Sequence, residues 1–464
     1  MNAIIFSAFW GVLMMFIGAF VKSKTAPKYI AVLGMLLLSI VNAVELSTGS
    51  PVFYINSMDM LRVDSFNLGF LQVIFGCSLI YFIMSGRDFE KIGEHVSEYF
   101  ALLFFVTVGI SLCATYNTLL ILFIGIEIMS IPLYVLTGAD KRNLKGNEAS
   151  LKYLLMGSFS TGILLMGIAF IYGGNPNASF YINSILLGEG SLNVMMTVGL
   201  VLMVVALSFK SSAAPFHFWA PDVYDGAPAV ITSHMASIIK VAAFYAFIRL
   251  FENAFGSVQA QWQNLIIFIT VATLLVGNLT AVFQQSVKRM LAYSSVAHAG
   301  FMMLGIFALN VLAKEGIVLY AAAYSLATIG LFGILVKMKD YTVDGFNGLY
   351  KTAPLVAICA TVFLLSLTGI PLTAGFQAKF FMLMAAAENG NHIWLIIVAV
   401  LFAAVSAYYY FRVIQAIYFK EPAEEIAIEK SEMTPGFRYM LILSVVLIIL
   451  IGIQPDLVIR WLHL

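Results

Sequence analysis

Four ionisable side chains stand inside long apolar runs of this 464-residue chain and are its strongest candidates for chemistry. They are Glu127, Lys210, Lys240 and Lys379. A lysine near the middle of a bilayer costs about 2.5–3.5 kcal/mol even on the milder insertion scale, and such residues usually mark ion or proton pathways. Burial disfavours the charged form of a lysine, and a nearby carboxylate favours it again. A lysine whose carboxylate partner moves can therefore load and release a proton.

Glu127 is the one carboxylate among the four, and we expect it to pair with Lys210. A static ion pair that only fixes helix packing is the alternative for these two residues. That alternative leaves Lys240 and Lys379 unexplained, because neither has a carboxylate inside its own apolar run. The pattern favours a line of protonatable groups.

His298 is a further candidate for this relay. It follows Ser294 by four residues, a spacing that places both side chains on one helix face. A hydrogen bond from the histidine to a neighbouring carbonyl is an equally good explanation. His234, six residues before Lys240, is a weaker candidate of the same kind.

Prolines and glycines interrupt the apolar runs beside two of the lysines. The residues are Pro215 and Pro221 after Lys210, and Gly369, Pro371 and Gly375 before Lys379. Proline removes a backbone donor and disfavours continued helix. We therefore expect a break after Lys210 and a helix broken in mid-membrane within 353–387. Such breaks supply hinges and free backbone groups that can line a wetted cavity. His217, Trp219 and Asp222 are expected to fix the first loop.

The composition predicts a polytopic membrane protein without bound cofactors. Hydrophobic residues make up 61% of the chain and charged residues 11%, about half the charge of a soluble protein. The net charge of +1 gives no sign of a nucleic-acid partner. The cysteines, at 77, 113 and 359, are too few for an iron–sulfur cluster or a structural zinc site. No Gly-rich phosphate loop follows a strand, so we expect no nucleotide, flavin or metal on this chain.

Apolar segments of about 17–25 residues predict an all-α fold of about fourteen transmembrane helices. Their expected ranges are 2–21, 29–44, 65–84, 99–114, 116–137, 151–172, 193–210, 227–250, 262–284, 287–309, 313–337, 353–387, 393–418 and 437–454. The two breaks suggest an internal repeat of five helices. We divide the chain into an N-terminal three-helix segment (1–97), two repeats (98–250 and 262–420), and a C-terminal loop with the last helix (421–464).

The basic residues predict the orientation of these helices. The loops on one side carry 18 lysines and arginines, and the loops on the other side carry 4. Positively charged loops stay in the cytoplasm. Both termini are therefore expected to face away from the cytoplasm.

The same residues carry a resemblance to a known family. Segment 215–228, the surroundings of Glu127 and Lys240, and residues 292–295 are similar to the antiporter-like subunits of respiratory complex I, the proton-pumping NADH:quinone oxidoreductase. The segment that looks most like the bacterial subunit N branch is Asp222-Val223-Tyr224-Asp225-Gly226-Ala227-Pro228. The subunit L branch has a long lateral helix after its last core spans, which we do not find here. The subunit M branch is expected to have glutamate where Lys379 stands.

The resemblance covers roughly residues 98–420 and implies a two-repeat fold of fourteen helices in the bacterial inner membrane. It implies proton-channel roles for Glu127, Lys210, Lys240 and Lys379, while His298 stands where the family has polar residues of varying type. It also implies that NADH, FMN, iron–sulfur clusters and quinone bind to partner subunits. The partners would be other membrane subunits and, through them, a hydrophilic redox arm, with lipid around the helices.

Three functions are compatible with these features. The first is a proton-translocating subunit of a quinone reductase, with no redox chemistry on this chain. The second is a subunit of a multi-protein sodium/proton antiporter, which has a similar fold and similar lysines. The third is a structural subunit that bridges its neighbours without pumping.

Overall fold

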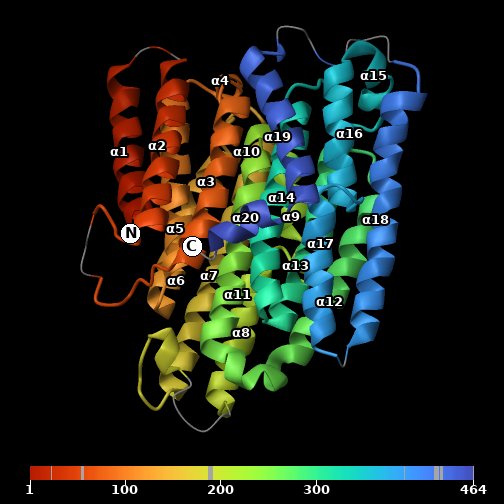
Figure 1. The fold of residues 1–464 in the computed structure, drawn as a ribbon. Coiled ribbons are helices and arrows are strands. Elements are labelled where there is room, and N and C mark those ends of the chain that lie inside the picture. The colour runs from red at the N-terminus through yellow and green to blue at the C-terminus, as the bar shows by residue number, and fades with distance from the viewer. Residues whose placement is uncertain are drawn as a thin grey trace.

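The computed structural model describes residues 1–21, 23, 25–53, 57–185, 192–390, 392–422, 428 and 432–462. Every regular element in these ranges is helical, and their only β-type pairings are three isolated bridges. Figure 1 shows a bundle of roughly parallel and antiparallel helices. The predicted all-α class is confirmed.

The first half of the chain contains α1 to α11. Their bounds are α1 Asn2–Phe20, α2 Ala26–Thr48, α3 Ser65–Ser85, α4 Phe89–Ile92, α5 Val96–Thr115, α6 Leu119–Thr137, α7 Leu144–Gly174, η1 Ile182–Ser184, α8 Val194–Lys210, α9 Trp219–Gly226, α10 Ala229–His234, η2 Met235–Ile239 and α11 Lys240–Phe255.

The second half contains the remaining elements. Their bounds are η3 Gly256–Val258, α12 Gln259–Val282, α13 Val287–Ala308, α14 Val311–Leu335, η4 Asp344–Phe346, α15 Leu349–Thr352, α16 Pro354–Thr368, α17 Ala374–Glu388, α18 Ile393–Phe419, α19 Pro435–Ile453, α20 Asp456–Ile459 and η6 Arg460–Leu462.

Eleven helical runs among the described residues are long and apolar enough to cross a membrane. One of these runs, residues 229–282, contains two crossings, because the turn η3 divides it. The shorter helix α8 adds a crossing, and α16 with α17 makes one broken crossing. Counted in this way, the described part of the chain has the fourteen crossings that the sequence predicts.

Polar side chains begin many of these helices. A side-chain oxygen accepts a backbone N–H of the first turn at Asp64, Thr118, Asn143, Asn193, Ser286, Asn310 and Thr434. Each such cap satisfies a backbone donor that has no partner within the helix. Short polar residues at the ends of apolar runs therefore set the helix starts.

The core of the bundle is built around α14. The apolar stretch of α14 is entirely buried and that of α13 is 94% buried, whereas those of α1 and α18 are only 28% buried. Figure 1 accordingly shows α14 in the middle, with α1 and α18 at opposite ends of the molecule. The two central helices are therefore shielded from lipid by the rest of the chain.

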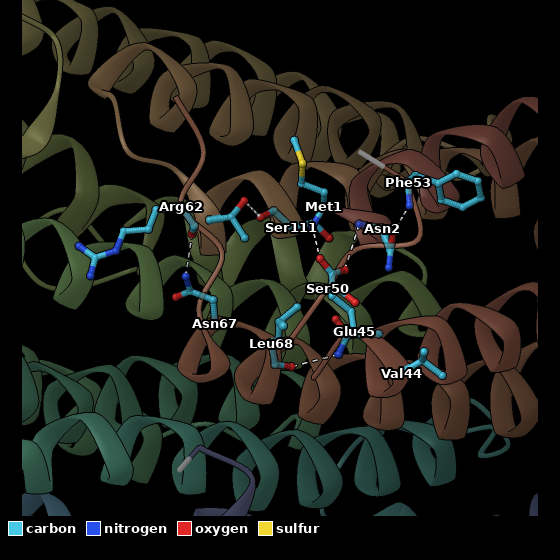
Figure 2. Close-up of polar contacts among 12 residues, drawn as sticks. Met1, Asn2, Val44, Glu45, Ser50, Phe53, Arg62, Asn67, Leu68 and Ser111 are labelled. Atoms are coloured by element: carbon cyan, nitrogen blue, oxygen red, sulfur yellow. Dashed lines mark hydrogen bonds and ion pairs between the residues drawn. The ribbon is translucent and has the colours of Figure 1, made fainter. Parts of the chain in front are cut away.

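A buried carboxylate joins the first two helices. Glu45 on α2 is 2% exposed, and it accepts hydrogen bonds from the ammonium of Met1 at 2.9 Å and the N–H of Asn2 at 3.1 Å (Figure 2). The predicted second span ended at residue 44, one position too early to include it. Glu45 is thus a buried charge that the sequence analysis did not single out.

Several predicted elements differ from the structure. The expected single helix 227–250 is α10, the π-helical turn η2 and α11 in succession, and the expected loop after Lys210 contains the helix α9. Helix α7 starts at Leu144 rather than residue 151, because Asn143 caps it there. The short elements α4, α15, α20 and η6 were not predicted. Part of the expected loop 421–436 lies outside the described residues.

Candidate functional site

Lys210 is the last residue of α8 and points into the bundle. Its side chain is buried, and Nζ donates to the hydroxyls of Ser130 at 2.6 Å and Tyr134 at 3.3 Å. The ammonium also lies 5.7 Å from the centre of the Tyr134 ring. Both partners are on α6, so this lysine joins the end of α8 to the middle of α6.

Glu127 stands one helical turn before Ser130 on α6. It is partly buried and lies within electrostatic reach of Lys210, but the Lys210 ammonium donates to Ser130 and Tyr134 and not to Glu127. Its Oε1 is buried and accepts no hydrogen bond from the described chain. The expected Glu127–Lys210 ion pair is therefore not formed in this structure, and a hydroxyl takes the place of the carboxylate.

The loop after Lys210 is fixed from several sides. Trp219 donates from Nε1 to the carbonyl of Phe209 at 3.0 Å. Its ring also stacks on that of Tyr153, with 4.8 Å between the ring centres. Buried His217 lies within electrostatic reach of Lys240. The loop thus lies between the two lysines of the first half.

Lys240 begins α11 directly after the π-helical turn η2. Its side chain is 1% exposed, and Nζ donates to the carbonyl and the hydroxyl oxygen of Ser295 at 2.7 and 2.9 Å. Ser295 lies on α13, in the half of the chain that also carries Lys379. A π-helical turn contains one residue more than the regular helix and is often found at functional sites. Lys240 therefore connects the two halves.

His298, on α13, contacts two other helices, α14 and α18, through tyrosine hydroxyl groups. Its Nδ1 lies 2.6 Å from the hydroxyl of Tyr320, and its Nε2 lies 3.2 Å from that of Tyr410. The Tyr410 hydroxyl is also 2.6 Å from Ser294 Oγ. Lys240 and Lys379 are both electrostatic neighbours of this histidine. The residues that share a helix face in sequence, Ser294 and His298, thus share one tyrosine partner.

Lys379 lies beside the break between α16 and α17. Its ammonium donates to the carbonyls of Leu367 and Thr368, both at 2.9 Å, and lies 4.8 Å from the ring centre of Phe301. These carbonyls belong to the last turn of α16, where a helix has no internal donors for them. The break that exposes them also gives the lysine its acceptors. The predicted break within 353–387 is confirmed.

Glycine makes the break possible. Gly369 has φ +87°, and a Cβ at Gly375 would lie 1.8 Å from the carbonyl oxygen of Ser366. No side chain fits at the second position without moving the backbone. The start of α17 therefore packs directly against the end of α16, beside Lys379.

A small cavity separates His298 from this break. Its volume is about 10 Å³, near the lower limit for one water molecule. His298, Tyr320 and Tyr324 form part of its wall, and Leu367 and Ala378 form the wall beside Lys379. The arrangement leads from Lys240 through Ser295 and the histidine cluster toward Lys379.

Sequence reasoning found the charges but missed most of their partners. The missed residues are Ser130, Tyr134, Ser295, Tyr320 and Tyr410. Serine and tyrosine are common in this chain, so their type alone gave no signal. Among the described residues, no group of three or more His, Cys, Asp or Glu could hold a metal ion.

Residues 116–406 match the family described as NADH:quinone oxidoreductase/Mrp antiporter, TM. The chain belongs to this family. The match includes the site residues from Glu127 to Lys379, and Tyr410 follows four residues after its end.

Individual members of the NADH:quinone oxidoreductase/Mrp antiporter family match almost the whole chain. NADH-quinone oxidoreductase subunit N of Trichlorobacter lovleyi is 37% identical over 97% of this chain and 93% of the relative. The protein of the same name from Cytophaga hutchinsonii is 35% identical over 99% of both. The resemblance to subunit N is confirmed.

Solved structures of this family share the fold. A chain of respiratory complex I from Thermus thermophilus with bound aureothin has a TM-score of 0.85 and 30% identity over 99% of both chains. A chain of the Mrp complex from Dietzia sp. has a TM-score of 0.87 at 20% identity, over 99% of this chain and 96% of that one. The second likeness shows the fold alone.

Proposed function

We propose that this chain is a proton-translocating membrane-arm subunit of a bacterial NADH:quinone oxidoreductase. The observation that carries the proposal is a set of three buried lysines, at positions 210, 240 and 379, that meet only uncharged oxygens among the described residues. Buried charges that only stabilise structure are normally paired with an opposite charge. The names of the relatives, at 35–37% identity over almost the full chain, point to the same function.

The proposed path uses the chain's own protonatable groups. Lys210 exchanges protons with Glu127 and the α6 hydroxyls, and Lys240 passes protons to the second half at Ser295. His298 connects this point to the cavity beside Lys379, which is the outlet of the path. A hydroxyl can donate and accept at once, so serine and tyrosine can relay a proton between nitrogen groups.

Redox chemistry belongs to other subunits in this proposal. NADH, FMN, iron–sulfur clusters and quinone would bind there, and this chain would contact other membrane subunits and lipid in the bacterial inner membrane. The apolar faces of α1 and α18, at opposite ends of the bundle, support contacts with lipid or with further membrane helices. The enzyme activity would thus be that of the complex.

Proton pumping by the assembled complex tests the proposal. Vesicles containing the complex are supplied with NADH and quinone, and protons moved are measured for each quinone reduced. We expect Lys210→Ala and Lys379→Leu to lower this ratio strongly in complexes of normal subunit content. Normal pumping by both variants would support the non-pumping structural role instead.

The sodium/proton antiporter reading is tested by the driving ion. A subunit of such an antiporter would take up sodium in exchange for protons without NADH. We expect an imposed pH difference to drive no sodium uptake through the complex. Sodium uptake that Lys210→Ala abolishes would favour the antiporter reading.

A further inference from the structure

One short helix stands between the two buried lysines of the first half. After Lys210 ends α8, the chain forms a loop and then α9 (Trp219–Gly226), and α10 begins shortly afterwards at Ala229. Lys240 follows on the same continuous run of helix. A displacement of α9 would therefore reach both lysines.

The end of α9 is held by a buried lysine that the proposed relay does not use. Lys288, in the first turn of α13, is 4% exposed and donates from Nζ to the carbonyls of Asp225 and Ala227, both at 2.7 Å. Carbonyls at a helix C-terminus lack internal donors and attract a positive charge. Lys288 thus attaches the last turn of α9 to α13.

The next residue of α13 strengthens this attachment. Arg289 donates from Nη2 to Asp222 at 3.1 Å, and its Nη1 lies 3.7 Å from a carboxylate oxygen of Asp225. Asp222 also accepts from Lys152 of α7 at 3.2 Å. We call Lys288, Arg289, Asp222 and Asp225 the α9 clamp. This clamp fixes α9 to α13 of the other half, and Lys152 fixes it to α7 of its own half.

The same helix α13 also holds Lys240. Ser295, which accepts both hydrogen bonds from Lys240, is about two helical turns after Lys288 and on the same face. The segment from Ala227 to Lys240 is therefore attached to α13 at both of its ends. The π-helical turn Met235–Ile239 lies within this segment.

We propose that Lys288 and Arg289 are positioning residues for proton transfer, because they set α9 and the segment leading to Lys240 against α13. The inference rests on the proposed function, since it assigns a role within the same proton path. Without the clamp, the segment from Ala227 to Lys240 keeps its hydrogen bond from Tyr81 to the carbonyl of Val230, but its near end loses the attachment to α13. Lys240 then meets Ser295 less often, and protons pass between the halves more slowly than quinone is reduced.

The first test compares three variants of the assembled complex in vesicles. Lys288→Met removes the ammonium and keeps a long side chain, whereas Lys288→Arg keeps donors for both carbonyls. Lys351→Met is the matched control, because Lys351 pairs with Glu421 on the exposed surface. We expect protons moved per quinone reduced to fall by about threefold or more in the methionine variant at position 288. The arginine variant should recover most of this ratio, and the control should keep it.

A double variant tests whether the clamp acts through Lys240. Ser295→Ala removes one of the two acceptors of Lys240. If both changes disturb the same contact, the double variant Lys288→Met/Ser295→Ala pumps as well as the more impaired of the two single variants. Losses that multiply would overturn the proposal, because they would show that Lys288 acts elsewhere.

Two further outcomes complete the test. Normal pumping by Lys288→Met would overturn the inference, and impaired pumping by Lys210→Ala in the same series would leave the proposed function standing. If Lys288→Met does not assemble, Arg289→Gln takes its place, because its partly exposed ion pairs contribute little to folding. A lowered ratio in that variant supports the clamp, and an unchanged ratio overturns it.

Discussion

The three buried lysines have the same kind of surroundings, although they lie on different helices. Each ammonium donates to hydroxyl or carbonyl oxygens, and the described residues provide no carboxylate at ion-pair distance. A carboxylate partner would add the attraction of an opposite charge, which favours the protonated form of a lysine, and an uncharged oxygen does not supply it. A proton is therefore held less firmly at these positions than in a buried ion pair, as transfer requires.

Replacing Lys210 tests this view at the first lysine. Lys210→Ala should assemble, because a small apolar residue is well tolerated in a membrane helix, and should lower pumping by roughly tenfold or more. Lys210→Arg keeps the charge but cannot readily lose its proton, so it should also impair transfer. Pumping per quinone reduced is the measurement. Full pumping in the arginine variant contradicts the loading-and-release role.

Replacing Lys379 tests the outlet. Lys379→Leu leaves the carbonyls of Leu367 and Thr368 without their donor and removes the protonatable group, so we expect pumping to be nearly lost. Lys379→Glu should retain part of it, because a protonated carboxyl can donate to one of these carbonyls and can also release its proton. If the leucine variant pumps normally in an intact complex, Lys379 is not the outlet.

The four site charges could be predicted because each one contrasts with the apolar residues around it. Their partners could not, since 21 tyrosines and many serines offer the same hydroxyl chemistry. Tyr134, Tyr320 and Tyr410 are selected by which helices meet. That information is not local in the sequence.

At the scale of elements, the break between α16 and α17 is the clearest feature. Gly375→Ala should lower the amount of assembled complex, because the added Cβ would lie 1.8 Å from the carbonyl oxygen of Ser366. Gly76→Ala on α3 is the matched control, since a Cβ there meets no atom within 4 Å. The measurement is the amount of complex on a native gel and its thermal midpoint. Equal behaviour of the two variants contradicts the tight closure.

A partly buried ion network joins the chain just after α14 to the chain just before α19. Lys337 lies 2.6 Å from Asp88 and 3.3 Å from Glu432, and Lys91 lies 2.6 Å from Glu432. Burial acts to raise the pKa of Glu432, but hydrogen bonds and charges from Lys91 and Lys337 hold it below its usual value. A carboxylate with a lowered pKa adds stability above its unfolded pKa of about 4.3. That contribution is lost as the pH falls through the folded pKa.

This network predicts a pH-dependent stability. Glu432→Gln should lower the thermal midpoint at neutral pH and make the midpoint fall less steeply as the solution is acidified. Glu421→Gln is the control, because Glu421 forms an exposed pair with Lys351. The measurement is the thermal unfolding of the purified complex at a series of pH values from neutral to acidic. An equally steep fall in the Glu432 variant would show that this carboxylate does not stabilise the fold.

Proline and glycine in the sequence predicted the breaks after Lys210 and between α16 and α17. The π-helical turn Met235–Ile239 was not predicted. A proline changes the backbone wherever it stands, so it can be read directly. A π-turn arises from one shifted set of backbone hydrogen bonds, and its residues are ordinary helix formers. Tertiary contacts at both ends, at Ala227 and Lys240, accompany it here.

At the scale of the molecule, the number of crossings followed from the length of the apolar runs. The position of α14 at the centre did not, because nearly all the runs are equally apolar. The fully buried stretch of α14 and the largely exposed α18 have mean hydropathies of 1.9 and 2.1. Hydropathy shows that a helix avoids water. It does not show whether the helix is surrounded by lipid or by other helices, because both surroundings are apolar.

The orientation of the molecule can be tested by labelling. A cysteine at Asn177, which is exposed, should react with an impermeant thiol reagent added outside the cell, and one at Lys141 should not. Lys141 is preferable to Asn143, because Asn143 caps α7. The native cysteines 77, 113 and 359 are buried and give little background. The opposite labelling pattern reverses the predicted topology.

The lack of carboxylates beside the lysines also has an electrical consequence. A proton that binds Lys240 or Lys379 adds a whole positive charge at that depth, with no opposite charge beside it to cancel the field. The membrane potential acts on such a charge with up to about 2.3 kcal/mol for each 100 mV. Voltage should therefore act on the occupancy of these lysines as well as on the net transport. The turnover rate of the complex, measured against an imposed potential, should fall more steeply than in a variant that gives Lys379 a carboxylate neighbour.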